Sequence, residues 1–223
     1  YSNAVTLGAN TTLTGNGIDF GSTINGAKTL TIVDSGATTL TGAIGNTTAL
    51  TSLTVGSTNG TSFNGATIDT TGGQTFSNAL TLGVDTTLTG NGINLASTVN
   101  SAPNTNVSLT IADSGATTLG GAIGGSRALS SLLVGSTNGT TISGGAVTTT
   151  GTQTFSNAVT LGQNATLTGN GITLGSTVNG AKALTIVDSG ATTLTGAIGN
   201  ATALASLTVG STNGTTFNGA TID

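Results

Sequence analysis

Short stretches in which apolar and polar residues alternate recur along the whole chain. Thr-Leu-Thr at 12–14 and Leu-Thr-Val at 53–55 are typical of them. A period of two places Leu, Ile, Val and Phe on one side of a strand and Thr on the other. Asn-Gly, Asp-Ser-Gly and Gly-Gly separate these stretches and favour tight corners. The pattern therefore predicts an all-β chain of many short strands joined by tight turns.

The pattern repeats at a long period. Nearly identical segments begin at Tyr1, Phe76 and Phe155, so the periods are 75 and 79 residues. The four additional residues lie around Pro103, where we expect a loop extruded from a corner. We divide the chain into repeats 1–75, 76–154 and 155–223, the last one truncated. We expect a single continuous segment of a longer array.

A finer period of about 25 residues divides each copy into three. Equivalent strands at this spacing predict a right-handed parallel β-helix, in which strands of successive rungs pair along the axis. Nine rungs would make a rod roughly 43 Å long, at about 4.8 Å per rung. One inward residue from each rung would form a single core column, which comprises Leu13, Leu40, Phe63, Leu88, Leu119, Ile142, Leu167, Leu194 and Phe217.

Composition narrows the possible chemistry. Charged residues make up 4% of the chain, with only three Lys and Arg, and Cys, Met, Trp and His are absent. Nucleic-acid binding needs many cations to neutralise phosphates, so we expect no nucleic-acid partner. We expect no metal or cofactor, because the common transition-metal ligands are missing. No apolar run is long enough to span a membrane, and the first residues lack the charged and apolar regions of a signal peptide, so we expect neither in this segment.

The motif Asp-Ser-Gly occurs at Asp34, Asp113 and Asp188 and resembles the core of aspartic proteases. Such catalysis requires two carboxylates that share a proton, and the rung spacing separates these three. We therefore interpret each motif as an Asx-type corner and expect no enzyme.

Two further motifs imitate binding or modification sites. Gly-Asn-Gly-Ile-Asp at 15–19 resembles part of a calcium-binding repeat, but its Asp19 is replaced by Asn94 and Thr173 in the other copies. We interpret it as a corner. Glycosylation sequons, which composition alone would produce, begin at Asn10, Asn46, Asn59, Asn138, Asn164, Asn200 and Asn213.

Pairs of Thr flank the inward residue of many rungs and would face outward. A flat Thr-rich face would offer an ice-binding or glycan-binding surface, although Ser, Asn and Gly interrupt it in several rungs. The alternative interpretation is that Thr is simply a favourable outward strand residue. The candidate face consists of Thr12, Thr14, Thr39, Thr41, Thr87, Thr89, Thr166, Thr168, Thr193 and Thr195.

In composition and order, the segments "FSNAVTLG", "TTLTGNG" and "LTIVDSGATTLTGAIG" resemble the repeat regions of filamentous-haemagglutinin-like bacterial exoproteins. These are surface adhesins exported by two-partner secretion or as autotransporter passengers. The resemblance implies a secreted β-helical shaft at the bacterial cell surface, used in adhesion, aggregation or biofilm. We also expect self-association along the axis, because exposed strand edges accept another strand, and sideways into fibres, with cell-surface or matrix polysaccharide as a further partner.

Overall fold

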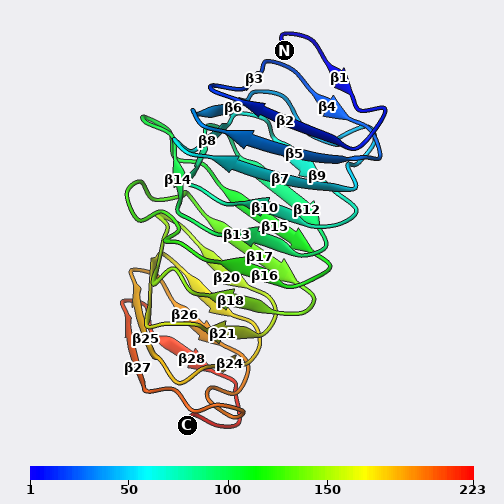
Figure 1. Cartoon of the computed structure of the whole chain (residues 1–223). Coiled ribbons are helices and arrows are strands. Elements are labelled where there is room, and N and C mark those ends of the chain that lie inside the picture. The colour runs from blue at the N-terminus through cyan, green and yellow to red at the C-terminus, as the bar shows by residue number, and fades with distance from the viewer.

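The chain winds into a rod of stacked turns with its two termini at opposite ends, as a computed structural model of residues 1–223 shows (Figure 1). All 28 regular elements are strands, and strands of adjacent turns pair in parallel. The predicted all-β parallel solenoid is confirmed. None of the regular elements is a helix, so no helix crosses a membrane.

Each turn crosses three sheets in the same order, which we name sheets A, B and C. Sheet A contains β1 (Val5–Thr6), β4 (Ile24–Asn25), β9 (Thr67–Asp69), β12 (Thr86–Gly90), β15 (Leu109–Asp113), β17 (Leu132–Ser136), β20 (Gln153–Phe155), β23 (Ile172–Leu174), β26 (Thr192–Leu194) and β28 (Thr215–Phe217). Sheet B contains β2 (Thr11–Gly15), β5 (Thr29–Asp34), β7 (Ser52–Ser57), β10 (Gln74–Phe76), β13 (Ile93–Leu95), β16 (Thr117–Leu119), β18 (Thr140–Ile142), β21 (Val159–Leu161) and β24 (Val178–Asn179). Sheet C contains β3 (Asp19–Phe20), β6 (Thr38–Leu40), β8 (Thr61–Phe63), β11 (Leu80–Leu82), β14 (Val99–Ser101), β19 (Ala146–Thr148), β22 (Ala165–Gly169), β25 (Ala183–Asp188) and β27 (Ser206–Ser211).

Single-residue bridges keep the three sheets continuous where a full strand is missing. Ile44, Ile123 and Ile198 provide these bridges in sheets A, C and B respectively. Each of them precedes a glycine with positive φ; for Gly45 the angle is 73°. A Cβ on Gly45 would collide with the carbonyl oxygen of Asp69 in the next turn. The chain therefore turns away at once, and the pairing shrinks to one residue.

Sheet A fixes the number of turns. Its inward column holds one apolar residue from each of eleven turns, and consecutive members are 19 to 24 positions apart. The column comprises Val5, Ile24, Ile44, Ile68, Leu88, Ile111, Val134, Phe155, Leu174, Leu194 and Phe217. At about 4.8 Å per turn, the rod is roughly 53 Å long.

The predicted nine rungs of about 25 residues are therefore wrong, and so is the predicted single core column. Its nine residues all face inward, and seven are buried, while Leu13 and Phe217 in the end turns are partly buried. Direct stacking joins only three pairs of them, which are Leu40 with Phe63, Leu119 with Ile142, and Leu194 with Phe217. Leu13 instead pairs with Ile32.

The 75-residue copy covers three and two-thirds turns, so equivalent residues lie on different sheets. Leu13, Leu88 and Leu167 occupy the same place in the three copies, yet they lie in sheets B, A and C. The four-residue insertion in the second copy leaves this phase unchanged. Successive copies are thus related by a rotation of one third of a turn and a rise of about 18 Å.

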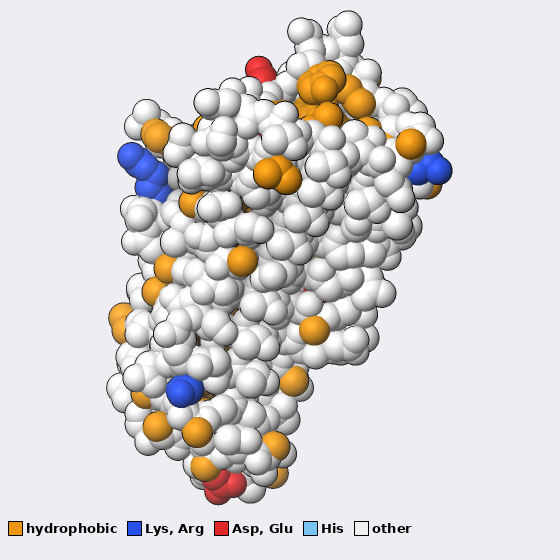
Figure 2. All heavy atoms as spheres, in the orientation of Figure 1, with side chains coloured by type: hydrophobic (Ala, Val, Ile, Leu, Met, Phe, Trp, Pro, Cys, Tyr) orange, Lys and Arg blue, Asp and Glu red, His pale blue; other side chains and the backbone are white.

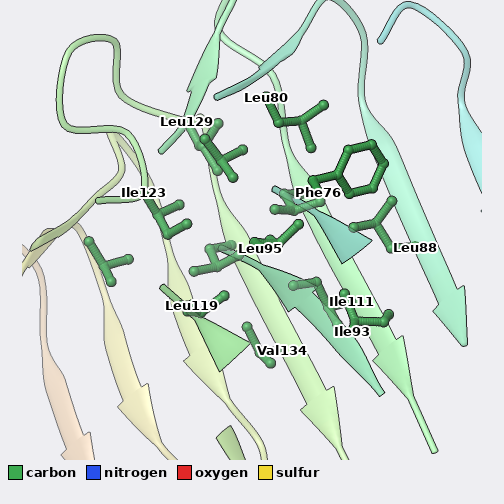
Figure 3. Close-up of a cluster of buried hydrophobic side chains, with 14 of the residues drawn as sticks. Phe76, Leu80, Leu88, Ile93, Leu95, Ile111, Leu119, Ile123, Leu129 and Val134 are labelled. Carbon is green, nitrogen blue, oxygen red and sulfur yellow. The ribbon is translucent and has the colours of Figure 1, made fainter. Parts of the chain in front are cut away.

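A continuous apolar core fills the rod. It contains 41 buried hydrophobic residues, including Phe63, Phe76 and Phe155. Figure 3 shows its middle, where Phe76 and Leu95 of sheet B, Leu88 of sheet A and Leu80 of sheet C point into the same interior. Each turn covers the side chains of its neighbours, which a single turn could not do alone.

Candidate functional site

Three buried aspartates are the most strongly organised polar groups in the molecule. Asp34 ends β5 with its side chain directed inward, and it is 2% exposed. Its carboxylate accepts hydrogen bonds from the backbone N–H groups of Gly17 and Ile18, both at 2.8 Å, in the preceding turn. In its own turn it accepts from the N–H of Gly36 at 2.9 Å and the hydroxyl of Thr38 at 2.8 Å.

The network continues into a third turn. The hydroxyls of Thr38 and Ser57 are hydrogen-bonded, and Ser57 pairs with Asp34 across sheet B. In the second copy the hydroxyl of Ser136 lies 2.9 Å from that of Thr117 and accepts the backbone N–H of Thr117. Each aspartate therefore ties together three consecutive turns at one corner of the rod.

These contacts decide the charge state of the three carboxylates. Burial of Asp34 raises its pKa, but donors from Ile18, Gly36, Gly17 and Thr38 outweigh burial and lower the pKa to about 2. Burial likewise opposes the backbone and Thr donors at Asp113 and Asp188, and the pKa of both is lowered from the usual value. Every donor favours the ionised form, so the corner holds a buried carboxylate without a cation.

The corner interpretation of Asp-Ser-Gly agrees with this geometry. Asp34, Asp113 and Asp188 lie in sheets B, A and C and are separated along the axis by about 18 Å per copy. No other carboxylate contacts any of them, and no cluster of acidic residues could hold a metal ion. The pairing that proton sharing requires is not formed.

The corner also explains a glycine in the motif. A Cβ on Gly36 would lie 2.5 Å from the backbone nitrogen of Gly17 and 2.7 Å from Oδ1 of Asn16. Gly115 and Gly190 are equally close to the preceding turn. The motif therefore brings two backbones together so that one carboxylate bonds to both.

The ten candidate Thr residues all face outward, but they do not form one face. Thr12 and Thr14 lie on sheet B, Thr87, Thr89, Thr193 and Thr195 on sheet A, and Thr39, Thr41, Thr166 and Thr168 on sheet C. The candidate Thr-x-Thr pairs therefore belong to three different sides of the rod, because each copy is rotated by a third of a turn relative to the one before.

The structure forms different outward columns that sequence comparison missed. Sheet B carries an unbroken line of Thr and Asn through nine consecutive turns, which we call the ridge. The ridge comprises Thr12, Thr31, Thr54, Thr75, Asn94, Thr118, Thr141, Thr160 and Asn179. A similar line on sheet A contains Thr110 and Thr173 but is interrupted by Leu133.

Two buried glutamines also escaped sequence reasoning. Gln74 and Gln153 are fully buried in the middle of inward columns otherwise rich in Leu and Ile. The side-chain nitrogen of Gln74 donates to the carbonyls of Ile68 at 3.1 Å and Thr89 at 2.8 Å. The side-chain oxygens of both glutamines have no partner. Gln74 lies in Gly-Gln-Thr-Phe and Gln153 in Thr-Gln-Thr-Phe. The one signal was the period of two, which places each Gln on the same side of its strand as the following Phe.

The remaining motifs lie at the surface. Asp19 is exposed at the start of sheet C, without other acidic residues around it. The inserted residues around Pro103 form the expected loop between β14 and β15, held by hydrogen bonds from Asn106 to Thr150 and from Ser101 to Ala128. All seven sequon asparagines are exposed.

Comparisons with protein-family models, with curated proteins and with solved structures find no match to this chain.

Proposed function

We propose that this chain forms part of the shaft of an extracellular bacterial adhesin or matrix filament. Its role is structural, since it provides a long and stiff rod. The observation that carries the proposal is the continuity of three parallel sheets from the first turn to the last. In such a stack each turn contacts only its neighbours, so length grows linearly with the number of copies.

The direction of the hydrogen bonds supports a load-bearing role. The backbone forms 136 hydrogen bonds over eleven turns, about twelve per turn, and most of them join adjacent turns along the axis. Pulling one turn from the next breaks the bonds of three sheets together. The buried aspartate corners add bonds that span the same boundaries, from Gly17 and Ile18 of the preceding turn to Asp34 and from Ser57 of the following turn to Thr38.

At a cell surface such a shaft would serve adhesion, aggregation or biofilm formation. Its proposed partners are other copies of the same chain and cell-surface or matrix polysaccharide. Electron microscopy of the purified protein tests the proposal. Thin rods of uniform width support it, and compact particles contradict it.

Binding of ice or glycan by an outward Thr face is the second candidate, and the nine-turn ridge on sheet B favours it. The column beside the ridge is not a second line of Thr, since Val33, Gly56 and Ser77 follow Thr14. Thermal hysteresis that is present in the intact chain and lost on Thr54→Tyr would favour this candidate over the shaft.

A further inference from the structure

The outer surface of sheet B has a regular relief. Beside the ridge runs a second outward column of eight residues, which we call the channel. The six that follow Val33 are all Gly, Ala or Ser. The channel comprises Thr14, Val33, Gly56, Ser77, Ala96, Gly120, Ser143 and Gly162. The longer side chains of the ridge thus lie next to the short side chains of the channel, and both columns have one residue per turn.

No charged side chain interrupts this surface. Every outward residue of the ridge and of the channel is uncharged, whereas sheet A presents Asp69 and sheet C presents Asp19. The valine of the channel, Val33, is 50% exposed. In Figure 2 two Lys or Arg side chains lie at the left and right margins of the visible face and a third lies in its lower part, while the clearly visible Asp side chains lie near its two ends. The sheet therefore offers neither repulsion nor attraction by charge.

The relief is complementary to a copy of itself. A twofold axis parallel to the rod places the ridge of one chain over the channel of the other along the full length. A twofold axis perpendicular to the rod places ridge on ridge. The spacing of 4.7–4.9 Å between ridge residues is that of strands in a sheet, so another β-solenoid matches it at every turn.

The available area is sufficient for a stable pair. The molecule exposes 8578 Å² over three long sides and two ends, so one side exposes roughly 2,500 Å². Covering about a third of that side buries about 800 Å² per partner, which is the size of a standard protein interface.

We propose that the outer surface of sheet B is a self-association surface, on which a second copy of this chain docks side by side and in parallel, ridge into channel. The inference rests on the proposed shaft function and names the surface through which shafts form fibres. Interdigitated Thr, Asn and small residues form the contact, as in a dry interface between stacked sheets.

Two matched double variants of the whole chain test the proposal. Thr54→Lys with Thr118→Lys places two charges on the ridge of sheet B, three turns apart. Thr110→Lys with Thr173→Lys places the same charges on half-buried outward Thr of sheet A, also three turns apart. Sedimentation equilibrium gives the dissociation constant, small-angle scattering gives the cross-section, and circular dichroism verifies the fold of each variant.

We expect the unmodified chain to dimerise with an increased cross-section and an unchanged length. We expect the sheet B variant to dimerise at least tenfold more weakly, because a buried unpaired charge is costly, and the sheet A variant to remain close to the unmodified chain. Equal weakening by both variants, association that lengthens the rod only, or rods that stay single overturns the inference. Single rods would contradict self-association but remain consistent with the proposed shaft function, whereas compact particles would contradict the shaft function as well.

Discussion

At the residue scale, buried polar groups rather than surface groups carry the specificity of this fold. Asp34 receives four hydrogen bonds inside a molecule with only ten charged side chains. A buried charge is tolerated only where its partners are supplied in full. The backbone of the preceding turn supplies two of them, so the carboxylate recognises the correct neighbouring turn.

Replacement of Asp34 by Asn should lower stability by about 1–3 kcal/mol, because the amide loses charge-assisted bonds and turns a donor toward backbone N–H groups. The midpoint of urea unfolding measures the effect. Asp69→Asn is the matched control, since Asp69 faces outward on sheet A and should change the midpoint little. Equal shifts for the two variants would contradict the role assigned to the corner.

The lowered pKa values make stability depend on pH in one direction. A carboxylate whose pKa is lower in the folded state stabilises the protein above its unfolded pKa, and this stabilisation is lost as the pH falls through the folded pKa. For Asp34 these limits are 3.8 and about 2. We expect the urea midpoint to be constant from pH 7 to about pH 5 and to fall between about pH 4 and pH 2.

The triple variant Asp34→Asn, Asp113→Asn, Asp188→Asn is the control for the pH dependence. Its midpoint should be lower throughout and should fall much less between pH 4 and pH 2. An unchanged acid slope in the triple variant would show that other groups determine the acid response.

At the element scale, strands of different sequence stack on each other, and this is where sequence reasoning failed. Leu13 in Thr-Thr-Leu-Thr-Gly pairs with Ile32 in Leu-Thr-Ile-Val-Asp, not with Leu40 in the next Thr-Leu-Thr stretch. Aligning like with like gave a period of 25, whereas the physical requirement is only an inward apolar residue of similar volume. Turn lengths from 19 to 24 residues hide the true period.

The parts that were predictable depend on local rules. Period-two alternation identified the inward side of the strands, and the nine predicted core residues do face inward. Asp-Ser-Gly identified the corners because Asx-type turns are local. The ridge on sheet B was not predictable, because it joins residues from different motifs, such as Thr75 and Asn94, that meet only in the folded rod.

Gly45→Ala should destabilise the protein by about 1–3 kcal/mol, because the position has positive φ and the Cβ would collide with the carbonyl oxygen of Asp69. Gly8→Ala is the control, since a Cβ on Gly8 meets nothing within 4 Å. Thermal unfolding followed by circular dichroism compares the two. A larger loss for Gly8→Ala would contradict the packing described for the single-residue bridges.

The inserted loop should be dispensable. Replacing residues 101–108 by Gly-Ala-Lys-Thr, the sequence of the first copy at 26–29, keeps the three and two-thirds turns of the copy. The replacement removes the buried Val107 and the hydrogen bond from Ser101 to Ala128, but its sequence closes the same corner in the first copy. We therefore expect a modest loss of stability, about 1–2 kcal/mol, and an unchanged circular dichroism spectrum. Loss of the β-sheet spectrum would show that the insertion sets the register.

At the scale of the whole molecule, the mismatch between repeat and turn distributes the aspartate corners over the three sides of the rod. Each copy begins a third of a turn from the previous one, so Asp34, Asp113 and Asp188 mark three different corners. Three copies complete eleven turns and restore the starting sheet. In a shaft built in this way, every corner of the rod carries the aspartate motif at regular intervals along the axis.

The most direct test of the account is the length of a tandem chain. Two copies of this sequence, joined by the segment 70–75 that follows the same Gly-Ala-Thr-Ile-Asp motif at 65–69, continue the array in phase. We predict that small-angle scattering at high dilution gives a length that rises from roughly 53 Å to roughly 106 Å with an unchanged cross-section. A thicker particle, or two rods joined at a flexible angle, would contradict the continuous eleven-turn shaft.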